Sequence, residues 1–326
     1  MSSGAAGCDG VVMRLLCGID HSTTSLAAAC FAGGVARRLD AELTLVHVVG
    51  RTAPVPPPDA PAPPPSEPDA TAPPAGAAVG PTARRALGAP GAAFGARGDD
   101  SPATAERMLR ERVEALAELT GARASLRIEH GAPAATLRRV ARETGCDLLV
   151  VGSSGRGRLA AALRPGVAQR LASAPPCPLA LVPEEATGAA AERIVVGCHG
   201  AAASPAATAA AARLAALLDA ELVLVPAVAG GRGRPTGWER YDAERRHRRA
   251  ARAAVGRAVP VSPAARAGDP VATVARPTGD DDAWMVVGQR SRGPLAVRLR
   301  RPLAADLAAV ARQPVVVVPD PGPAAG

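Results

Sequence analysis

The sequence contains no lysine, few aromatic residues and no long apolar run. All 38 basic residues are arginine. Aromatic residues make up only 2% of the chain, so the core must be aliphatic, and the chain lacks aromatic platforms on which bases could stack. No window approaches the roughly 20 uninterrupted apolar residues that a membrane span requires. We therefore expect a cytoplasmic protein that does not enter a membrane.

The net charge of +8 raises the question of nucleic-acid binding, because clustered cations neutralise phosphates. The arginines are scattered, however. The densest basic run, residues 240–252, contains interleaved acidic residues, which is typical of a solvated helix face. Nucleic acid is therefore not an expected partner, and a phosphate-binding patch on this run is the alternative.

Motifs for metal binding and for catalysis are also missing. No His, Cys and Asp residues share metal-ligand spacing, and no Ser-His-Asp or paired-carboxylate arrangement can be assembled from local motifs. The six cysteines form no C-x-x-C pair and several lie in apolar runs, which predicts reduced, buried thiols. They are Cys8, Cys17, Cys30, Cys146, Cys177 and Cys198.

An internal duplication organises the chain. The segment Asp40–Val46 recurs as Asp219–Val225 with six identities in seven, at an offset of 179 residues. Further along, Cys146–Gly152 pairs with Asp282–Gly288 at an offset of 136. The first copy therefore carries an insertion of about 42 residues, and the sequence predicts two domains in tandem.

The insertion is identified by its composition. Residues 51–100 are rich in proline and alanine and cannot bury enough apolar surface to fold, so we expect a disordered loop. We assign it no function, and docking into a proline-binding groove is the alternative. The predicted boundaries are a flexible start at 1–12, a first domain at 13–185, a second domain at 190–319 and a flexible tail at 320–326.

The pattern within the first copy predicts a doubly wound α/β domain. Short, continuous apolar runs typical of buried parallel strands alternate with segments of helical period. The expected strands are 13–19, 43–49, 124–129, 147–152 and 179–182, and the expected helices are 22–39, 103–120, 133–144 and 166–174. The second copy begins in the same way, so each domain is predicted to be a parallel sheet flanked by helices.

Ligands bind open parallel sheets beyond the carboxyl ends of the strands. Asp20 follows the first expected strand, beside hydroxyl groups, where an acidic helix cap is the structural alternative. After the fourth expected strand come Gly152 and Gly155, and glycines allow backbone N–H groups to approach phosphate oxygens. A glycine-rich turn is also common in any tight connection between a strand and a helix.

Five motifs together resemble those of the universal stress proteins. They are Gly18-Ile-Asp20, Ala41-Glu-Leu-Thr-Leu-Val-His47-Val48, Gly131-Ala-Pro133, Asp147-Leu-Leu-Val-Val-Gly152-Ser-Ser-Gly155 and Pro176-Cys-Pro178. The resemblance implies a five-stranded parallel sheet with helices on both faces, paired through its last strand. It also implies ATP binding through a G-x-x-G-x9-G-(S/T) motif, with no enzyme activity beyond weak ATP hydrolysis.

The family's ligand contacts carry over to matching residues of the first copy. By the resemblance, Asp20 holds the nucleoside end and the backbone around Val48 meets adenine. Val151, Gly152 and Gly155 line the path of the ribose and phosphates.

Gly18 completes the first motif of this predicted site. Pro165 replaces the third glycine of the phosphate motif and Gly166 replaces its hydroxyl residue, so the amides of Gly166 and Val167 would have to substitute. These changes weaken the expectation of phosphate binding.

The second copy departs further from the family pattern. His199 stands for Asp20, Ala227 for Val48, Ser291 for Gly155, and Arg301-Pro302 for the last glycine and hydroxyl. We interpret this copy as degenerate and retained for pairing and stability in an internal pseudo-dimer.

Three functions are compatible with the sequence. The leading hypothesis is a stress-response protein whose first domain senses ATP, accompanied by Mg²⁺, and which signals to an unidentified protein partner. Whether the chain also forms a homodimer is left open by the sequence. The second is a nucleotide-free scaffold. The third is an ATP-using PP-loop enzyme, but the consecutive small residues of that loop, Ser-Gly-Gly-x-Asp-Ser, are missing.

Overall fold

A computed structural model describes both halves of the chain. The described residues are 12–20, 22–50, 102–153, 166–186, 191–198, 203–226, 245, 248–253, 255, 261–263, 283–289 and 311–319. The predictions made for the insertion at 51–100, for most of residues 1–12 and for the tail at 320–326 lie outside these residues.

The first half alternates strands and helices along the chain. Its elements are β1 (Arg14–Ile19), α1 (Thr23–Leu39), β2 (Glu42–Val49), α3 (Pro102–Thr120), β3 (Ala124–His130), α4 (Pro133–Thr144), β4 (Leu148–Ser153), α6 (Val167–Ser173) and β5 (Leu179–Pro183). Each of these elements begins and ends within one residue of the range that the apolar runs and helical periods predict.

The second half repeats this order in its described part. Its elements are β6 (Arg193–Cys198), α7 (Ala203–Leu217), β7 (Glu221–Pro226), β8 (Val261–Pro263), β9 (Ala283–Gly288) and β10 (Val315–Val318).

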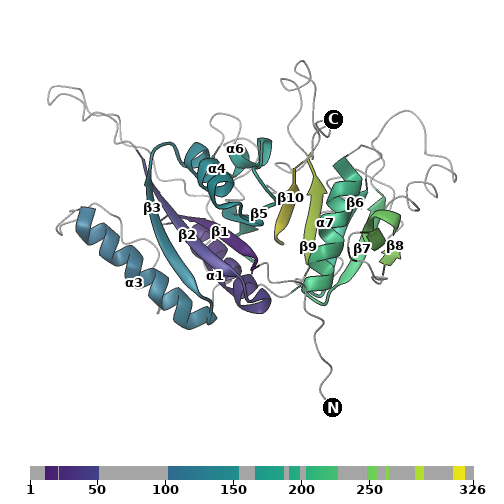
Figure 1. The fold of residues 1–326 in the computed structure, drawn as a ribbon, viewed down its shortest axis with the longest axis horizontal. Helices are drawn as coiled ribbons and strands as arrows, with labels where there is room; N and C mark the ends of the chain where they lie inside the picture. The colour runs from purple at the N-terminus through teal and green to yellow at the C-terminus, as the bar shows by residue number, and fades with distance from the viewer. Residues whose placement is uncertain are drawn as a thin grey trace, which may run out of the picture.

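The ten described strands form one sheet in the order β3-β2-β1-β4-β5-β10-β9-β6-β7-β8. Every pair within a half is parallel, and β5 and β10 join the halves as an antiparallel pair in which Ala180 faces Val316. Figure 1 shows the two halves side by side, with β5 and β10 between them. The predicted fold, two doubly wound α/β domains in tandem, is confirmed.

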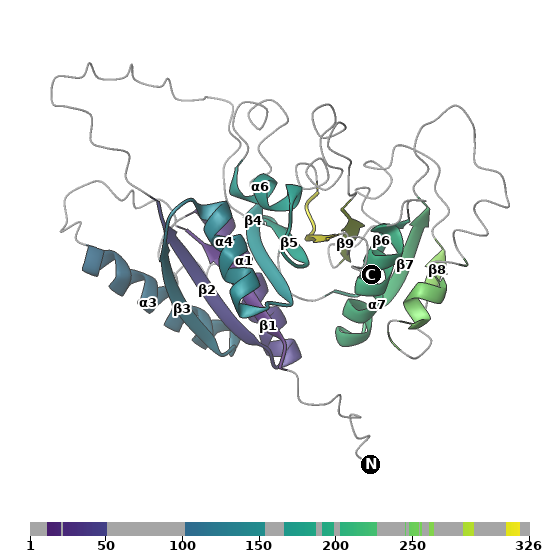
Figure 2. The same ribbon diagram turned by 45° about the horizontal axis from the view of Figure 1, so that its top comes forward.

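Helices cover both faces of the sheet, as Figure 2 shows for α1 and α4. Phe31 of α1 packs in one apolar cluster with Val150 of β4, and Leu137 of α4 packs in a second cluster with Val151. Successive residues of a strand point to opposite faces, so a strand covered on both sides must be apolar throughout. This explains the continuous apolar runs of the sequence.

The halves also share side-chain contacts. The rings of Phe31 in α1 and Trp284 in β9 lie with their centroids 4.8 Å apart, and Trp284 is 1% exposed. The Arg38 guanidinium donates a hydrogen bond to the carbonyl oxygen of Leu218, and the Gln289 side chain donates one to the carbonyl oxygen of Ser173. Both apolar clusters also run through the two halves.

Candidate functional site

The strand order of the first half reverses at β1, which lies between β2 and β4. The chain leaves β1 through α1 on one face and reaches β4 through α4 on the other. Such a switch point opens a crevice at the carboxyl ends of the strands. A pocket with a cavity volume of about 110 Å³, partly open to solvent, lies there.

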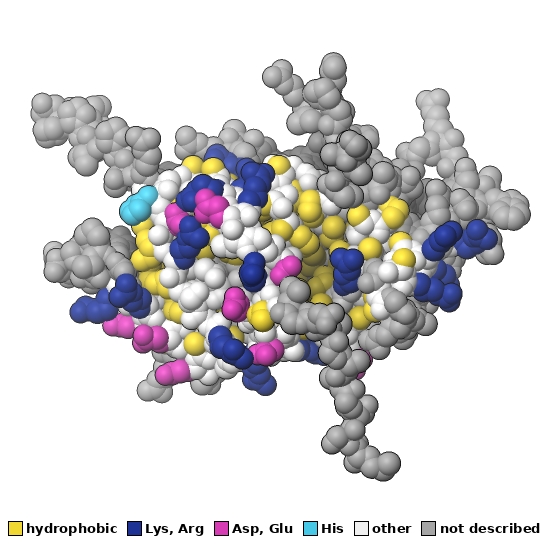
Figure 3. Space-filling model, in the orientation of Figure 1, with side chains coloured by type: hydrophobic (Ala, Val, Ile, Leu, Met, Phe, Trp, Pro, Cys, Tyr) yellow, Lys and Arg dark blue, Asp and Glu magenta, His cyan; other side chains and the backbone are white. Residues whose placement is uncertain are grey.

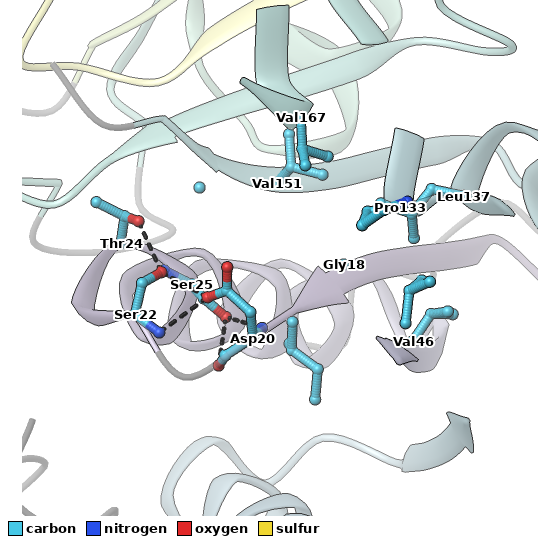
Figure 4. A pocket seen from close by; sticks show the side chains of 13 residues that line it. Gly18, Asp20, Ser22, Thr24, Ser25, Val46, Pro133, Leu137, Val151 and Val167 are labelled. Atoms are coloured by element: carbon cyan, nitrogen blue, oxygen red, sulfur yellow. Dashed lines mark hydrogen bonds between the residues drawn. The ribbon is translucent and has the colours of Figure 1, made fainter. Parts of the chain in front are cut away.

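Thirteen residues line this pocket (Figure 4), and they come from β1, β2, β4, α1, α4, α6 and the turn between β1 and α1. They are Gly18, Ile19, Asp20, Ser22, Thr24, Ser25, Val46, Val48, Pro133, Leu137, Val151, Gly152 and Val167. Polar side chains gather on one wall and aliphatic side chains on the other.

The polar wall is built by the turn from β1 into α1. Asp20 Oδ1 accepts hydrogen bonds from the backbone N–H of Ser22 at 2.8 Å and from its hydroxyl at 2.5 Å. The Asp20 N–H donates to Ser25 Oγ at 2.7 Å, and Ser25 Oγ donates back to the Asp20 carbonyl oxygen at 3.2 Å. The two bonds from Ser22 hold the Asp20 side chain, and the two with Ser25 hold its backbone, at the mouth of the crevice.

The structure corrects the alternative role considered for Asp20. The N-cap of α1 is Ser22, whose backbone is extended and whose hydroxyl accepts from the Ser25 N–H at 3.1 Å. Asp20 precedes the cap and holds it in place through an Asx-type turn. The bonds from Ser22 use Oδ1 of Asp20, so a contact across the pocket would use its other carboxylate oxygen, Oδ2.

The apolar wall combines residues from four elements, β2, β4, α4 and α6. Val46 and Val48 lie two residues apart on the same face of β2. Val151 lies on β4, and Leu137 lies one helical turn after Pro133 in α4. Figure 4 shows Val151 beside Val167, the first residue of α6. A flat, apolar group held between these side chains would place its polar edge toward the turn at Asp20.

Glycine at position 152 is required by packing. A Cβ atom at this position would lie 2.5 Å from the Thr24 carbonyl oxygen and 3.0 Å from the Ser25 nitrogen, both of which are backbone atoms. At Gly18, which pairs with Val46 on one side and Val151 on the other, a Cβ would lie 2.9 Å from a methyl group of Leu137. Both glycines let the elements around the pocket approach closely.

Gly166 is the N-cap of α6 and has open space around it, because a Cβ there would meet no atom within 4 Å. Its N–H, one of the predicted phosphate donors, donates to Gln169 Oε1 at 3.3 Å. A phosphate that used this N–H would have to displace the Gln169 side chain. Gly155, Pro165 and the turn between them lie outside the described residues.

Six of the eight predicted site residues line this one pocket. They are Gly18, Asp20, Val48, Val151, Gly152 and Val167. Gly166 adjoins the pocket next to Val167 in the chain. The sequence reasoning missed Val46, although it lies two residues before Val48 on the same face of a strand, and Leu137, although it follows the motif residue Pro133 at helical spacing.

Among the described residues that line the pocket, Asp20 is the one with an ionisable side chain. Outside the pocket, Arg127 and Arg139 pair with Glu129, at 2.7 Å for Arg139, and both also pair with Glu143. The hydrogen bonds from Arg127 and Arg139 lower the pKa of Glu129. Blue and magenta side chains likewise intermingle on the left of Figure 3, which agrees with the scattered charge of the sequence.

Searches of the described residues found neither a metal centre nor a membrane span. No group of three or more His, Cys, Asp and Glu side chains there could hold a metal ion. In the same part of the chain, each helix is too short or too polar to cross a membrane. The second-half positions that correspond to the site, His199, Ala227, Ser291 and Arg301-Pro302, lie outside the described residues.

Comparison with known proteins identifies the family. The family model described as "Universal stress protein family" matches residues 12–183 and 191–319. A universal stress protein from Archaeoglobus fulgidus DSM 4304 superposes with a TM-score of 0.64 at 14% identity, covering 94% of this chain and 98% of that chain. At this identity the likeness shows the fold.

Two further solved structures are similar to this chain. A functionally unknown protein from Pseudomonas aeruginosa PAO1 has 17% identity and a TM-score of 0.49, covering 95% of this chain and 93% of that chain. A universal stress protein in complex with cAMP has 19% identity and a TM-score of 0.34, covering 53% of this chain and 98% of that chain. No match was found among curated proteins.

Proposed function

The chain belongs to the universal stress protein family, and from this premise we propose that its first half binds an adenine nucleotide, ATP by the family motif, at the pocket between β1, β2 and β4. The observation that carries the proposal is the placement of Asp20 opposite an aliphatic wall at the switch point of the sheet. The remaining geometry supports one orientation of the nucleotide in this pocket.

The chemistry of Asp20 supports a nucleoside end in this pocket. An ionised carboxylate only accepts hydrogen bonds, so its ligand partner must be a donor such as an amino group or a ribose hydroxyl. Phosphate oxygens would be repelled by it. The base would therefore lie against Val48 and Val151, with the phosphates directed away from Asp20, past Gly152.

The phosphate end has weaker support. The described lining contains no cation, and the N–H of Gly166 already has Gln169 Oε1 as its partner. Phosphates would gain the amides of Gly166 and Val167 only at the cost of that bond, and Mg²⁺ bound to ATP would supply the missing positive charge. We therefore propose binding without efficient turnover, with hydrolysis at most weak.

Helix α6 connects the pocket to the second half. Its first residue, Val167, lines the pocket, and the carbonyl oxygen of its last residue, Ser173, accepts a hydrogen bond from Gln289. The strand that follows α6 is β5, which pairs with β10. Nucleotide binding would shift α6, and the second half, retained as the partner in an internal pseudo-dimer, would report that shift to a protein partner.

A nucleotide-free scaffold is the second candidate, and specific contacts favour it. Asp20 Oδ1 and the Gly166 N–H both have partners within the chain. Gly152 is explained by its approach to Thr24 without any ligand. If the polar groups of the site are satisfied in this way without a ligand, the core that the two halves share is the feature on which the scaffold function depends.

Thermal unfolding of the full chain with and without nucleotide separates the two candidates. A ligand that binds only the folded state at about 100 times its Kd stabilises it by about 2.7 kcal/mol. We expect Mg-ATP to raise the melting temperature, and ADP and cAMP serve as alternatives in the same assay. No shift with any of them, at millimolar concentration, would overturn nucleotide binding in favour of the scaffold.

Variants test whether the rise in melting temperature comes from nucleotide bound at this pocket. Asp20→Ala removes the carboxylate and should abolish the shift. Asp20→Asn keeps the oxygen that accepts from Ser22 and should lose less unliganded stability while still weakening binding. Glu42→Gln, at the exposed start of β2 and the opposite end of that strand, is the matched control and should retain the full shift.

A further inference from the structure

Two cysteines that are 31 residues apart in the sequence meet in the first half. Cys146 lies two residues before β4 and Cys177 two residues before β5, and their sulfur atoms are 3.1 Å apart. Both are free thiols, and both pack in the apolar cluster on the α4 side of the sheet. We propose that Cys146 and Cys177 form a redox-active thiol pair that hydrogen peroxide oxidises to an intrachain disulfide.

The backbone on both sides of the pair is already fixed. The N–H of Cys146 donates to the Ala141 carbonyl oxygen at 3.1 Å, in the turn that ends α4 at Gly145. The N–H of Leu149 donates to the Pro178 carbonyl oxygen at 2.9 Å, and Leu149 faces Leu179 in the sheet. Neither cysteine therefore needs a change of secondary structure to meet the other.

The two sulfur atoms already lie close enough for a disulfide to form with little movement. They need only close from 3.1 Å to about 2.05 Å, the length of an S–S bond.

The two thiols differ in a way that assigns their roles. Cys177 is partly exposed, whereas Cys146 is only 6% exposed. The hydrogen bond from the Cys146 thiol lowers the pKa of Cys177, with a smaller contribution in the same direction from the Leu149 backbone, while burial and Asp147 act against it. The same hydrogen bond, together with burial, raises the pKa of Cys146. Cys177 is therefore the attacking sulfur and Cys146 the resolving one.

The reaction balances with hydrogen peroxide as the oxidant. The Cys177 thiolate attacks one peroxide oxygen, the O–O bond breaks, and a sulfenic acid forms with release of water after protonation. Cys146 sulfur then attacks the Cys177 sulfur, its thiol proton leaves with the hydroxyl group as a second water, and the S–S bond forms. Two thiols and one peroxide thus give one disulfide and two waters, and a small thiol can reverse the reaction.

The other described pair of thiols in this half provides an internal contrast. Burial raises the pKa of Cys17, which is fully buried in β1, and the nearby Cys30 raises it further. Burial likewise raises the pKa of Cys30 in α1. Both should stay unreactive under conditions that oxidise Cys177, so the reaction is expected to be selective within one folded chain.

Peptide mapping of the full-length protein tests the proposal directly. Cleavage after arginine yields residues 143–156 and 171–193, each containing one of the two cysteines and no other. After treatment with a small molar excess of hydrogen peroxide, these peptides should be joined and lighter by two hydrogen atoms, and a reductant should separate them. Absence of the joined peptide while other thiols oxidise would overturn the proposal.

Single variants and an unfolded control sharpen the result. Cys146→Ser should leave Cys177 to accumulate as a sulfenic acid that dimedone traps, and Cys177→Ser should leave Cys146 unmodified. Cys30→Ser is the matched control and should form the joined peptide in unchanged yield. If the joined peptide forms equally well in denaturant, proximity in the fold is not its cause and the proposal fails.

The disulfide would also change stability. It would close a loop that contains β4 and α6, and cross-linking a loop of this length stabilises the folded state mainly by restricting the unfolded one. The oxidised protein should therefore melt several degrees higher than the reduced protein, and Cys177→Ser should lose this difference. None of these readouts depends on nucleotide, so the proposal can fail or succeed independently of the proposed function.

Discussion

Gly152→Ala should destabilise the protein in the absence of any ligand. The added methyl group would lie 2.5 Å from the Thr24 carbonyl oxygen, 2.6 Å from the Thr24 carbonyl carbon and 3.0 Å from the Ser25 nitrogen. All three are backbone atoms of the first turn of α1, and α1 packs against the sheet through buried residues such as Ala28 and Phe31. The clash cannot be relieved by rotating a side chain, so either β4 or the start of α1 must move.

The size of the effect follows from overpacking in a dense core. Such substitutions typically cost about 1–3 kcal/mol. For a domain of about 150–250 residues, the size class of the first half, each kcal/mol lowers the melting temperature by about 2–4 °C. Denaturant unfolding should show a lower midpoint concentration with an unchanged m-value, because the surface exposed on unfolding stays nearly the same.

Gly50→Ala is the matched control, because a Cβ at Gly50 meets no atom within 4 Å. It should match the parent or gain slightly, since alanine restricts the unfolded chain more than glycine does. Equal midpoints for Gly152→Ala and the parent, measured without nucleotide, would refute the packing explanation. The glycine would then be explained by ligand approach alone, as the sequence suggested.

Two further variants test other parts of the first half. Gly166→Ser places the hydroxyl of the family motif at an N-cap that has free space and ordinary backbone angles. It should raise the free energy of unfolding by a few tenths of a kcal/mol and tighten Mg-ATP binding measured by calorimetry. Unchanged or weaker binding would contradict phosphate binding at this position. Glu129→Gln tests the ion pairs with Arg127 and Arg139. Because these arginines lower the pKa of Glu129 in the folded state, its contribution is present above the ordinary glutamate pKa of about 4.3 and is lost as the pH falls toward the folded value. The parent should therefore lose stability more steeply than Glu129→Gln below about pH 4.3, and parallel acid curves would contradict this.

The fold could be predicted from the sequence because its signals are local and repeated. Continuous apolar runs marked the parallel strands, and the repeat of Asp40–Val46 as Asp219–Val225 marked the second copy. Residues that follow a strand at the switch point were predictable as well, since the carboxyl ends of parallel strands share one edge. This reasoning brought Gly18, Asp20 and Gly152 to one pocket.

Contacts between distant segments could not be predicted in this way. The approach of Thr24 to Gly152 depends on how closely α1 packs on β4, and sequence spacing says nothing about that distance. The contact between Cys146 and Cys177 depends on β4 and β5 being neighbours, and the search for C-x-x-C spacing missed it. Ser22 rather than Asp20 caps α1 because the helix begins at Thr23, two residues later than a cap at Asp20 would require.

The antiparallel pairing of β5 with β10 has a consequence for how the two copies can evolve. In a pair made of two identical chains, every substitution occurs on both sides of the junction, and assembly falls off as the protein is diluted. In this chain the partner is tethered, so the pairing is intramolecular and does not depend on expression level. A substitution on one side of the junction also leaves the other side unchanged, so one copy can lose or change a site while the other keeps it.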